Sequence, residues 1–355
     1  MTTSDTRVQD FLQNYYGTHL QSGDDLKTNA CCASGAPPRH VADVLSNVHD
    51  DVQSRFYGCG FPIPLALAGA TVVDLGCGTG RDVYCLSQLV GPDGFVHGVD
   101  MTKEQLEVGR ETLAWHMDKF GFEKPNVDFH KGFIEELGAL PIEPGTVDLI
   151  VSNCVFNLSP RKDLVLEEVW KLLKPGGEFY FSDVFCDRRL PEDIASDPVL
   201  HAECLGGAMY INDFVALANK IGFAELRQIT EAPITIHNDE LEAMVGAAHF
   251  TSNTWRLFKL ENLEPQCEDY GQVATYKGGI EGAEKLFWLD DHHAFEAGRP
   301  ERVCGNTASM LEDTRLAPYF EVVGNRKVHY GLYPCEPTLA ARTALESGDG
   351  SGGCC

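Results

Sequence analysis

Three glycines on alternate positions stand at the centre of the segment VVDLGCGTGRD, residues 72–82. Gly76, Gly78 and Gly80 follow a β-branched pair and an acidic residue, Asp74. A strand that turns through glycines into a helix brings backbone N–H groups and a helix N-terminus up to a ligand. Asp100 ends a second apolar run, where a carboxylate can bind ribose hydroxyls. Alone, the glycines could form an ordinary turn; with both acids they favour a nucleoside site.

Thiols form the second group of candidate residues, because the chain contains 13 cysteines. Cys59 lies between two glycines, Cys154 follows an apolar run, and Cys204 precedes a glycine pair. Soft thiolates select thiophilic centres, and three converging thiols would form a trigonal site with one open face. The simpler alternative for any one of them is a buried, inert thiol. We favour that alternative for three further cysteines: Cys77, Cys85 and Cys186.

Alternating strand-like and helix-like runs position these residues. Strands are predicted at 71–75, 95–99, 127–130, 147–152 and 178–182, with helices at 81–90, 102–120 and 164–173. This alternation predicts an α/β fold with a mostly parallel, doubly wound sheet. Ligands of such sheets lie beyond the carboxyl ends of the strands. Asp74, Asp100, residues 133–135, Asn153 and Cys154 all lie there, which predicts a single cleft.

The remainder of the chain divides into three parts around this domain. We predict an N-terminal helical segment at 1–60, the main domain at 61–260, a small C-terminal domain at 261–340 and a flexible tail at 341–355. Val8, Phe11, Leu12 and Tyr15 form an apolar stripe on the first helix. Further strands are expected at 223–230, 234–237 and 255–260. His292 and His293, beside two aspartates, are most simply a solvated polar turn.

Bulk composition excludes several functional classes. The 355 residues include 28 basic and 53 acidic side chains, a net charge of −25. Nucleic acids require a basic face, so neither they nor anionic membranes are expected partners. The chain has no apolar run of about 18 residues and no export signal at its N-terminus. We therefore expect a cytoplasmic monomer whose cysteines are reduced thiols.

The glycine loop, its two aspartates and the later LKPGG turn resemble class I S-adenosylmethionine-dependent methyltransferases with a Rossmann-like fold. A nicotinamide dinucleotide fits less well, because the third glycine is one position too early. The resemblance implies that the loop backs the methionine moiety and that Asp100 binds the ribose. It also implies a cofactor site that comprises Tyr57, Asp74, Gly76, Gly78, Asp100, Met101, Phe133, Ile134, Glu135 and Asn153.

A more specific resemblance covers the chain from its N-terminal helix to its last domain. The segments NACCAS, NVHDDVQSRFYGCG, VSNCVFNLSP, LKPGGEFYFSDV and ECLGGAMY are similar to those of arsenite methyltransferases. The resemblance implies that Cys59, Cys154 and Cys204 bind As(III). It implies that Cys32, beside Cys31, is a mobile redox cysteine that often pairs with Cys59 in a disulfide.

The activity implied by this resemblance is methylation of arsenite and methylarsenite, which gives mono- and dimethylated arsenicals and leaves trimethylated arsenicals open as a further product. Methylation formally oxidises arsenic, so a cysteine disulfide would form and thioredoxin or glutathione would reduce it. Two alternatives are a small-molecule C-methyltransferase that acts on a quinone or sterol, and a non-catalytic arsenite-sequestering protein. The first would keep its activity after Cys→Ser changes, and the second would release no S-adenosylhomocysteine.

Overall fold

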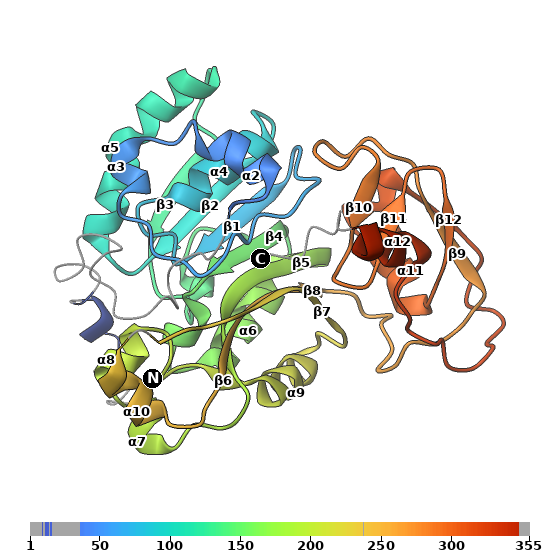
Figure 1. Ribbon diagram of the computed structural model, residues 1–355. Helices are drawn as coiled ribbons and strands as arrows, with labels where there is room; N and C mark the ends of the chain where they lie inside the picture. Colours follow the sequence, from blue (N-terminus) through green and yellow to red (C-terminus); the bar gives the residue numbers. More distant parts are fainter. Residues whose placement is uncertain (1–8, 10, 14, 16–35, 237, 348–355) are drawn as a thin grey trace.

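A mixed sheet with helices on both faces forms the main domain of the computed structural model (Figure 1). The structure describes the chain except for residues 1–8, 10, 14, 16–35, 237 and 348–355. Within that part the sheet has eight strands, ordered β3-β2-β1-β4-β5-β8-β7, with the short β6 beside β5. The pairs that join β3, β2, β1, β4 and β5 are parallel, whereas β8 runs antiparallel to β5 and to β7. The predicted α/β fold with a mostly parallel sheet is confirmed.

The elements of this domain follow the predicted alternation closely. The strands are β1 (Thr71–Leu75), β2 (Phe95–Asp100), β3 (Val127–Lys131), β4 (Val147–Asn153), β5 (Leu173–Cys186), β6 (Met209–Tyr210), β7 (Leu226–Pro233) and β8 (Phe250–Phe258). The helices are α2 (Arg39–Leu45), α3 (Asp50–Gln53), α4 (Arg81–Val90), α5 (Lys103–Phe120), α6 (Lys162–Leu172), α7 (Glu192–Ala195), α8 (Pro198–Ala202), α9 (Ile211–Ile221) and α10 (Asp239–Val245).

Two hydrophobic cores cover the two faces of the sheet. Adjacent residues of a strand point to opposite faces, and accordingly Val72 packs into the core beneath α2 and α4, whereas Val73 packs into the core beneath α6 and α9. Both valines are fully buried. The continuous apolar runs of the sequence thus arise because each central strand is covered on both sides.

Several local predictions differ from the structure. Ile234 donates its N–H to Phe250 O, but residues 234–236 form no strand, because the register of β7 ends at Pro233. Thr102, the first residue of the helix predicted at 102–120, is the N-cap of α5, whose helical residues begin at Lys103. Leu12 of the predicted N-terminal stripe is buried while Phe11 is 39% exposed, so the stripe is narrower than expected. Val8 lies outside the described residues.

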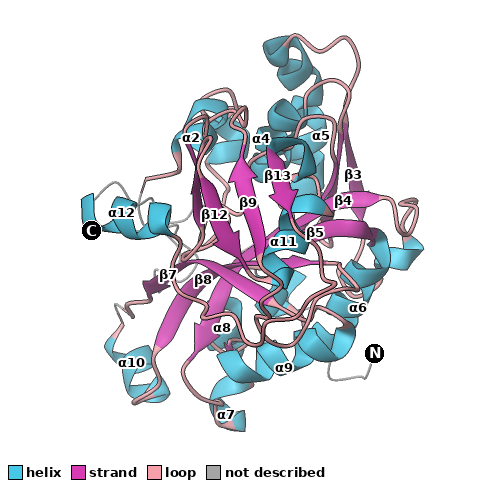
Figure 2. Ribbon diagram, turned by 90° about the vertical axis from the view of Figure 1, so that its right-hand side faces the viewer, coloured by secondary structure: helices cyan, strands magenta, loops and turns pink. Residues whose placement is uncertain are grey.

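A second unit follows the sheet and consists of small β-structures with two helices (Figure 2). One antiparallel sheet has the order β12-β9-β13, and a hairpin pairs β10 with β11. A disulfide joins Cys267 to Cys335 across 68 residues, so the expectation of reduced thiols is wrong for this pair. The elements are β9 (Gln272–Tyr276), β10 (Leu286–Trp288), β11 (Ala294–Glu296), β12 (Pro300–Val303), α11 (Gly305–Glu312), β13 (Phe320–Val323) and α12 (Leu339–Ser347). Among the helices described, none has the length and apolarity to cross a membrane.

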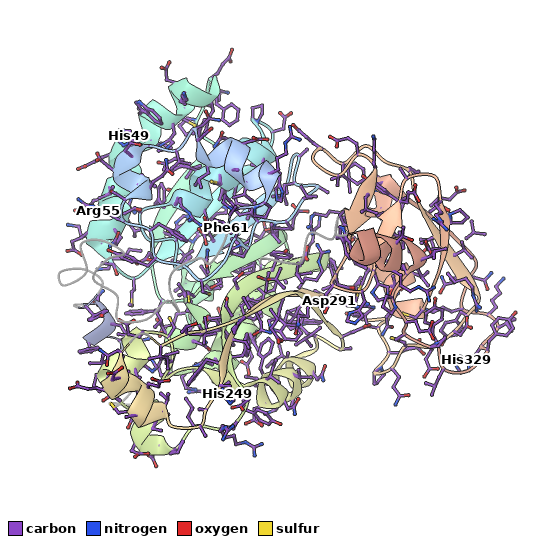
Figure 3. All side chains as sticks on the ribbon, viewed as in Figure 1. His49, Arg55, Phe61, His249, Asp291 and His329 are labelled. Carbon is purple, nitrogen blue, oxygen red and sulfur yellow. A yellow bond between two sulfur atoms is a disulfide. The ribbon has the colours of Figure 1, made fainter. Side chains whose placement is uncertain are left out.

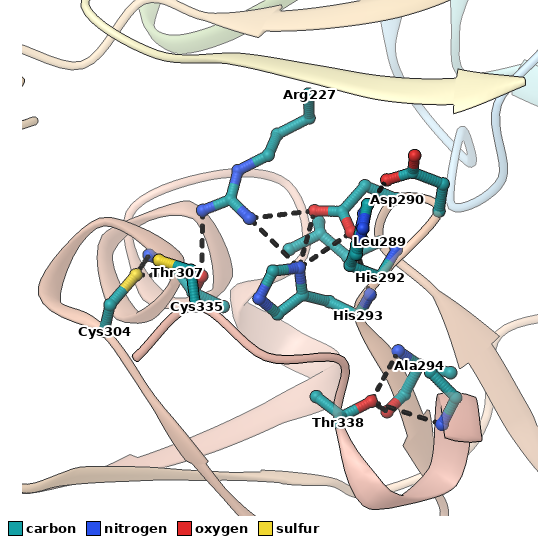
Figure 4. A network of polar contacts seen from close by, with 12 residues as sticks. Arg227, Leu289, Asp290, His292, His293, Ala294, Cys304, Thr307, Cys335 and Thr338 are labelled. Atoms are coloured by element: carbon teal, nitrogen blue, oxygen red, sulfur yellow. Dashed lines mark hydrogen bonds and ion pairs between the residues drawn. The ribbon is translucent and has the colours of Figure 1, made fainter. Parts of the chain in front are cut away.

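Buried ion pairs join the second unit to the sheet. The Arg227 guanidinium reaches from β7 to Asp290 Oδ2 at 2.9 Å and to Thr307 Oγ1 at 2.9 Å (Figure 4). Asp290 also contacts the His293 ring at 2.7 Å. The expectation of a solvated turn is therefore wrong for Asp290 and His293, which are 3% and 7% exposed. Only their neighbours Asp291 and His292 reach solvent, and Figure 3 shows Asp291 at the junction between the two units.

Candidate functional site

The glycine loop between β1 and α4 has left-handed backbone at all three glycines. Gly76, Gly78 and Gly80 have φ values of +70°, +53° and +92°. The backbone N–H groups of Gly76 and Cys77 both donate to Val99 O, at 2.7 and 3.0 Å, which folds the loop against the end of β2. A Cβ atom at Gly76 would lie 2.3 Å from the side chain of Val155, so no larger residue fits there. At Gly78 a Cβ atom would meet nothing within 4 Å, because this residue faces the open cleft.

Two aspartates lie beside this loop, of which Asp74 is buried and Asp100 is partly buried. Asp100 accepts hydrogen bonds from Gly78 N at 2.9 Å and from Thr102 N at 2.7 Å, which fixes its carboxylate in the cleft. Burial raises the pKa of Asp100, against the effect of these hydrogen bonds. Burial raises the pKa of Asp74 further, and the neighbouring Asp82 and Asp100 add to that rise. A cationic ligand would relieve the repulsion among these carboxylates.

One cleft contains every residue predicted for the cofactor. The space measures about 1060 Å³, including the part that is open to solvent. Its lining includes Tyr57, Asp74, Gly76, Gly78, Asp100, Met101, Phe133, Ile134, Glu135 and Asn153. The apolar pair Phe133–Ile134 can flank a base, and the aspartates can accept hydrogen bonds from ribose hydroxyls or face a cation. The residues present thus fit a positively charged nucleoside cofactor.

Asn153, predicted to contact the cofactor, makes three hydrogen bonds to the protein itself. Its Oδ1 accepts from Gly60 N at 3.2 Å, and its Nδ2 donates to Gly60 O at 2.9 Å and to Asp82 Oδ2 at 3.0 Å. Asp82 in turn pairs with Arg81 at 2.7 Å, whose guanidinium lies 3.0 Å from the centre of the Phe56 ring. Asn153 therefore links the start of α4 to the loop that contains Cys59.

Two of the three predicted thiols come together next to this cleft. The Sγ atoms of Cys59 and Cys154 lie within 4.8 Å of each other and of a carboxylate oxygen of Asp183. The thiol of Cys204 donates to the backbone carbonyl of Cys154 at 3.4 Å. All three cysteines are buried in one hydrophobic cluster, and Cys154 also lines the cofactor cleft.

The backbone around these cysteines is unusually constrained. Cys154 and Cys204 have φ values of +60° and +61°, in the left-handed region that a residue with a Cβ rarely adopts. Cys154 N donates to Ser182 O at 2.8 Å, and Ser252 Oγ donates to Cys59 O at 2.9 Å. These bonds attach the thiol-bearing loops to β5 and β8.

Two charged residues lie close to the thiol cluster formed by Cys59, Cys154 and Cys204, and no sequence pattern predicted them. Asp183 is fully buried and accepts from Asn157 N at 3.0 Å, from Asn157 Nδ2 at 2.8 Å and from Val184 N at 2.8 Å. Lys162 donates to Asn157 O at 3.0 Å and to Ser159 O at 2.9 Å. Burial lowers the pKa of Lys162 to about 8, partly offset by the charges of Asp183 and Cys204.

The remaining predicted residues lie in different places. Cys31 and Cys32 lie outside the described residues, as do Cys354 and Cys355. Cys77, Cys85 and Cys186 are buried, and burial raises the pKa of each thiol. Close to the N-terminus, Gln13 Nε2 donates to Met101 O at 2.8 Å, and Tyr15 Oη donates to Glu203 beside Cys204 at 3.3 Å. This segment therefore packs over both the cleft and the thiol cluster.

Comparisons with known proteins agree with this geometry. Residues 67–239 match a family described as a methyltransferase domain, and residues 270–340 match the arsenite methyltransferase C-terminal domain. An arsenite methyltransferase of Aquipseudomonas alcaligenes is 52% identical over 92% of this chain and 94% of its own length. The arsenite methyltransferase of Homo sapiens is 46% identical over 97% and 90% of the two chains.

A solved structure is also similar throughout its length. It is CrArsM, an arsenic(III) S-adenosylmethionine methyltransferase from Chlamydomonas reinhardtii, with 50% sequence identity and a TM-score of 0.82. The similarity covers 84% of the present chain and all of the solved one.

Proposed function

The chain belongs to the arsenite methyltransferase family, an S-adenosylmethionine-dependent enzyme family, and we propose that its substrate As(III) is bound by Cys59, Cys154 and Cys204. The observation that carries this proposal is the approach of the Cys59 and Cys154 thiols to within 4.8 Å in a buried cluster beside the cofactor cleft. Cys204 lies next to them, since its thiol donates a hydrogen bond to the backbone carbonyl of Cys154 at 3.4 Å.

Thiol exchange accounts for capture of the substrate. Each cysteine thiol that replaces a hydroxyl of arsenous acid forms one As–S bond and releases one water, so no oxidant is needed. Soft sulfur ligands suit this thiophilic centre better than oxygen does. Cys204 must turn its thiol away from the Cys154 carbonyl to become the third ligand, a side-chain rotation within an existing contact. The left-handed backbone at Cys154 and Cys204 supports a functional role, because such strain concentrates at active sites.

Residues of the cleft hold the methyl donor. Asp100 and the open backbone at Gly78 would bind the ribose and the amino-acid portion, and Phe133 and Ile134 would flank the adenine. S-adenosylmethionine, when bound, supplies an electrophilic methyl group on a cationic sulfonium. Asp74 and Asp82 place two carboxyl groups in the same cleft, and a cationic ligand would interact with them more favourably than a neutral one, because it stabilises their ionised form. Because Cys154 lines this cleft, arsenic held there lies near the donor.

Electron balance calls for a further pair of thiols. Transfer of a methyl cation to As(III) formally leaves arsenic two electrons more oxidised, and oxidation of two thiols to a disulfide returns those electrons. We assign this role to Cys32 with Cys59, on the family resemblance alone, and thioredoxin or glutathione would reduce the disulfide. Methylarsenite would then be the substrate of a second round.

Product analysis of cysteine variants tests this assignment. Purified protein is incubated with arsenite, S-adenosylmethionine and a thiol reductant, and S-adenosylhomocysteine and arsenic species are measured over time. Cys59→Ser, Cys154→Ser and Cys204→Ser should each lose arsenite methylation. Cys304→Ser is the matched control, because Cys304 caps α11 far from the site and serine is a good N-cap. Full activity of Cys154→Ser and Cys204→Ser toward every trivalent arsenical would contradict the three-thiol site.

A further inference from the structure

A buried carboxylate accompanies the two neighbouring thiols of the arsenic site. Cys59 Sγ, Cys154 Sγ and an oxygen of Asp183 are mutually within 4.8 Å, and all three residues are buried. Arsenite binding as argued above has no use for this oxygen. We propose that Cys59, Cys154 and Asp183 also form a site for a divalent cation of the Zn²⁺ class, which competes with arsenite for the two thiols.

Ligand spacing favours such a cation. Zinc binds sulfur at about 2.3 Å and carboxylate oxygen at about 2.0–2.2 Å in tetrahedral geometry, so its ligand atoms lie roughly 3.5–3.8 Å apart. The three atoms already lie within 4.8 Å of one another, so small side-chain shifts suffice to close the site. A water molecule can occupy the fourth position.

Surrounding donors orient the carboxylate as they do in metal sites. Asp183 accepts from the backbone N–H of Asn157 at 3.0 Å, from the Asn157 amide at 2.8 Å and from Val184 N at 2.8 Å. Ligating carboxylates are normally held by such second-sphere hydrogen bonds. The Asp183 side chain is therefore oriented before any cation arrives.

Charge balance also favours a divalent ion. Binding of Zn²⁺ would displace two protons from Cys59 and Cys154, leaving two thiolates and one carboxylate around the metal. The nearby Lys162 ammonium, whose charge acts on Asp183, together with the cation offsets these three negative charges. Buried charges are tolerated when they are paired in this way.

The two ligands make different demands on the same pocket. Arsenite uses three thiols, including Cys204, whereas the cation uses Asp183 and needs only two thiols. The cation site shares Cys59 and Cys154 with the proposed arsenic site, but single substitutions distinguish the two sites. Cys204→Ser should lose arsenite methylation and retain the cation, while Asp183→Asn should lose the cation preferentially.

The full-length protein, reduced with a phosphine, provides the test. Zn²⁺ affinity is measured by competition with a chromophoric chelator, and Co²⁺ reports thiolate coordination through its charge-transfer absorption. Zn²⁺ should inhibit competitively with arsenite. Asp183→Asn should weaken Zn²⁺ binding roughly tenfold or more, Cys59→Ser should abolish the Co²⁺–thiolate signal, and Cys204→Ser should bind Zn²⁺ within a few-fold of wild type.

Several results would overturn the proposal. Non-competitive inhibition, or unchanged Zn²⁺ affinity in a folded Asp183→Asn variant, would remove the carboxylate from the site. If Asp183→Asn does not fold, as judged by its thermal transition, the Cys59→Ser and Cys204→Ser comparison decides alone. Loss of Zn²⁺ binding in Cys204→Ser would then show a three-thiol site in place of the one proposed. Arsenite turnover in the same variants tests the proposed function separately.

Discussion

Removing the Asn153 amide should disturb the arsenic site more than the cofactor site. Asn153 makes two hydrogen bonds to Gly60, at 2.9 and 3.2 Å, and one to the Asp82 carboxylate at 3.0 Å. A neutral hydrogen bond contributes about 1 kcal/mol and one to a charged group about 1.5–3 kcal/mol, so loss of all three bonds in Asn153→Ala should cost roughly 3.5–5 kcal/mol. The Cys59 loop should then move relative to Cys154. Methylation of arsenite should fall further than that of methylarsenite, which needs fewer protein thiols.

Asn126→Ala supplies the matched control for this experiment. Asn126 is buried and also makes three hydrogen bonds, to Ser87 Oγ, Ser87 O and Gly91 O, at the start of β3 away from the cleft. Urea unfolding gives the stability loss of both variants, and initial rates give their activity with each arsenical and the KM for S-adenosylmethionine. Equal loss with both arsenicals in Asn153→Ala, or a change in the cofactor KM alone, would refute a role in placing Cys59.

Three further predictions concern the loop, the pH dependence and the junction between the units. Gly76→Ala should lower the affinity for the cofactor and reduce the free energy of unfolding by about 2–4 kcal/mol, because the new Cβ atom overlaps Val155 and the backbone is left-handed. Gly121→Ala is the control: its φ is also positive, at +72°, but the Cβ atom enters open space. It should cost only about 1 kcal/mol in urea unfolding and leave cofactor binding unchanged. Burial lowers the pKa of His116 to about 4, so on acidification this side chain takes up a proton at a higher pH in the unfolded chain than in the folded protein. The free energy of unfolding should therefore fall between pH 6.5 and pH 4. An equally steep fall in His116→Gln would contradict this. Asp290→Ala should lower the melting temperature, because it removes one of the two carboxylates that pair with the buried Arg227 while Glu225 remains at 2.7 Å, at a cost of about 1.5–3 kcal/mol; an unchanged transition would refute that role.

The cofactor cleft could be predicted from the sequence because its residues follow a rule of sheet geometry. Parallel strands end at one edge, so Asp74, Asp100 and Asn153, each at or near the end of a predicted strand, had to lie near one another. The glycine spacing then placed the loop that faces them. This rule does not predict which partner each side chain binds. Asn153, for example, lines the cleft but hydrogen-bonds to Gly60 and Asp82.

Other features depend on contacts that have no sequence signature. Asp183 lies inside an apolar strand, and its approach to Cys59 depends on how the loop before β1 crosses the sheet. Arg227 and Asp290 are 63 residues apart in the sequence and belong to the two different units. The sequence around Asp290 alone therefore indicates only a polar turn. Pairing of Cys267 with Cys335 likewise depends on the path of the chain through the second unit.

Glycines beside the cysteines indicated function, and the structure gives a physical reason for their positions. A Cβ atom at Gly60 would lie 2.5 Å from Ser182 Oγ, and one at Gly207 would lie 2.1 Å from Asn157 O. Gly60 thus lets its cysteine loop press against β5, and Gly207 lets the other press against the segment that follows β4. Neither has positive φ, so close approach, and not conformational freedom, explains them. The same close packing brings Cys59 and Cys204 to Cys154, and so the glycine pattern and the gathering of thiols have a common cause.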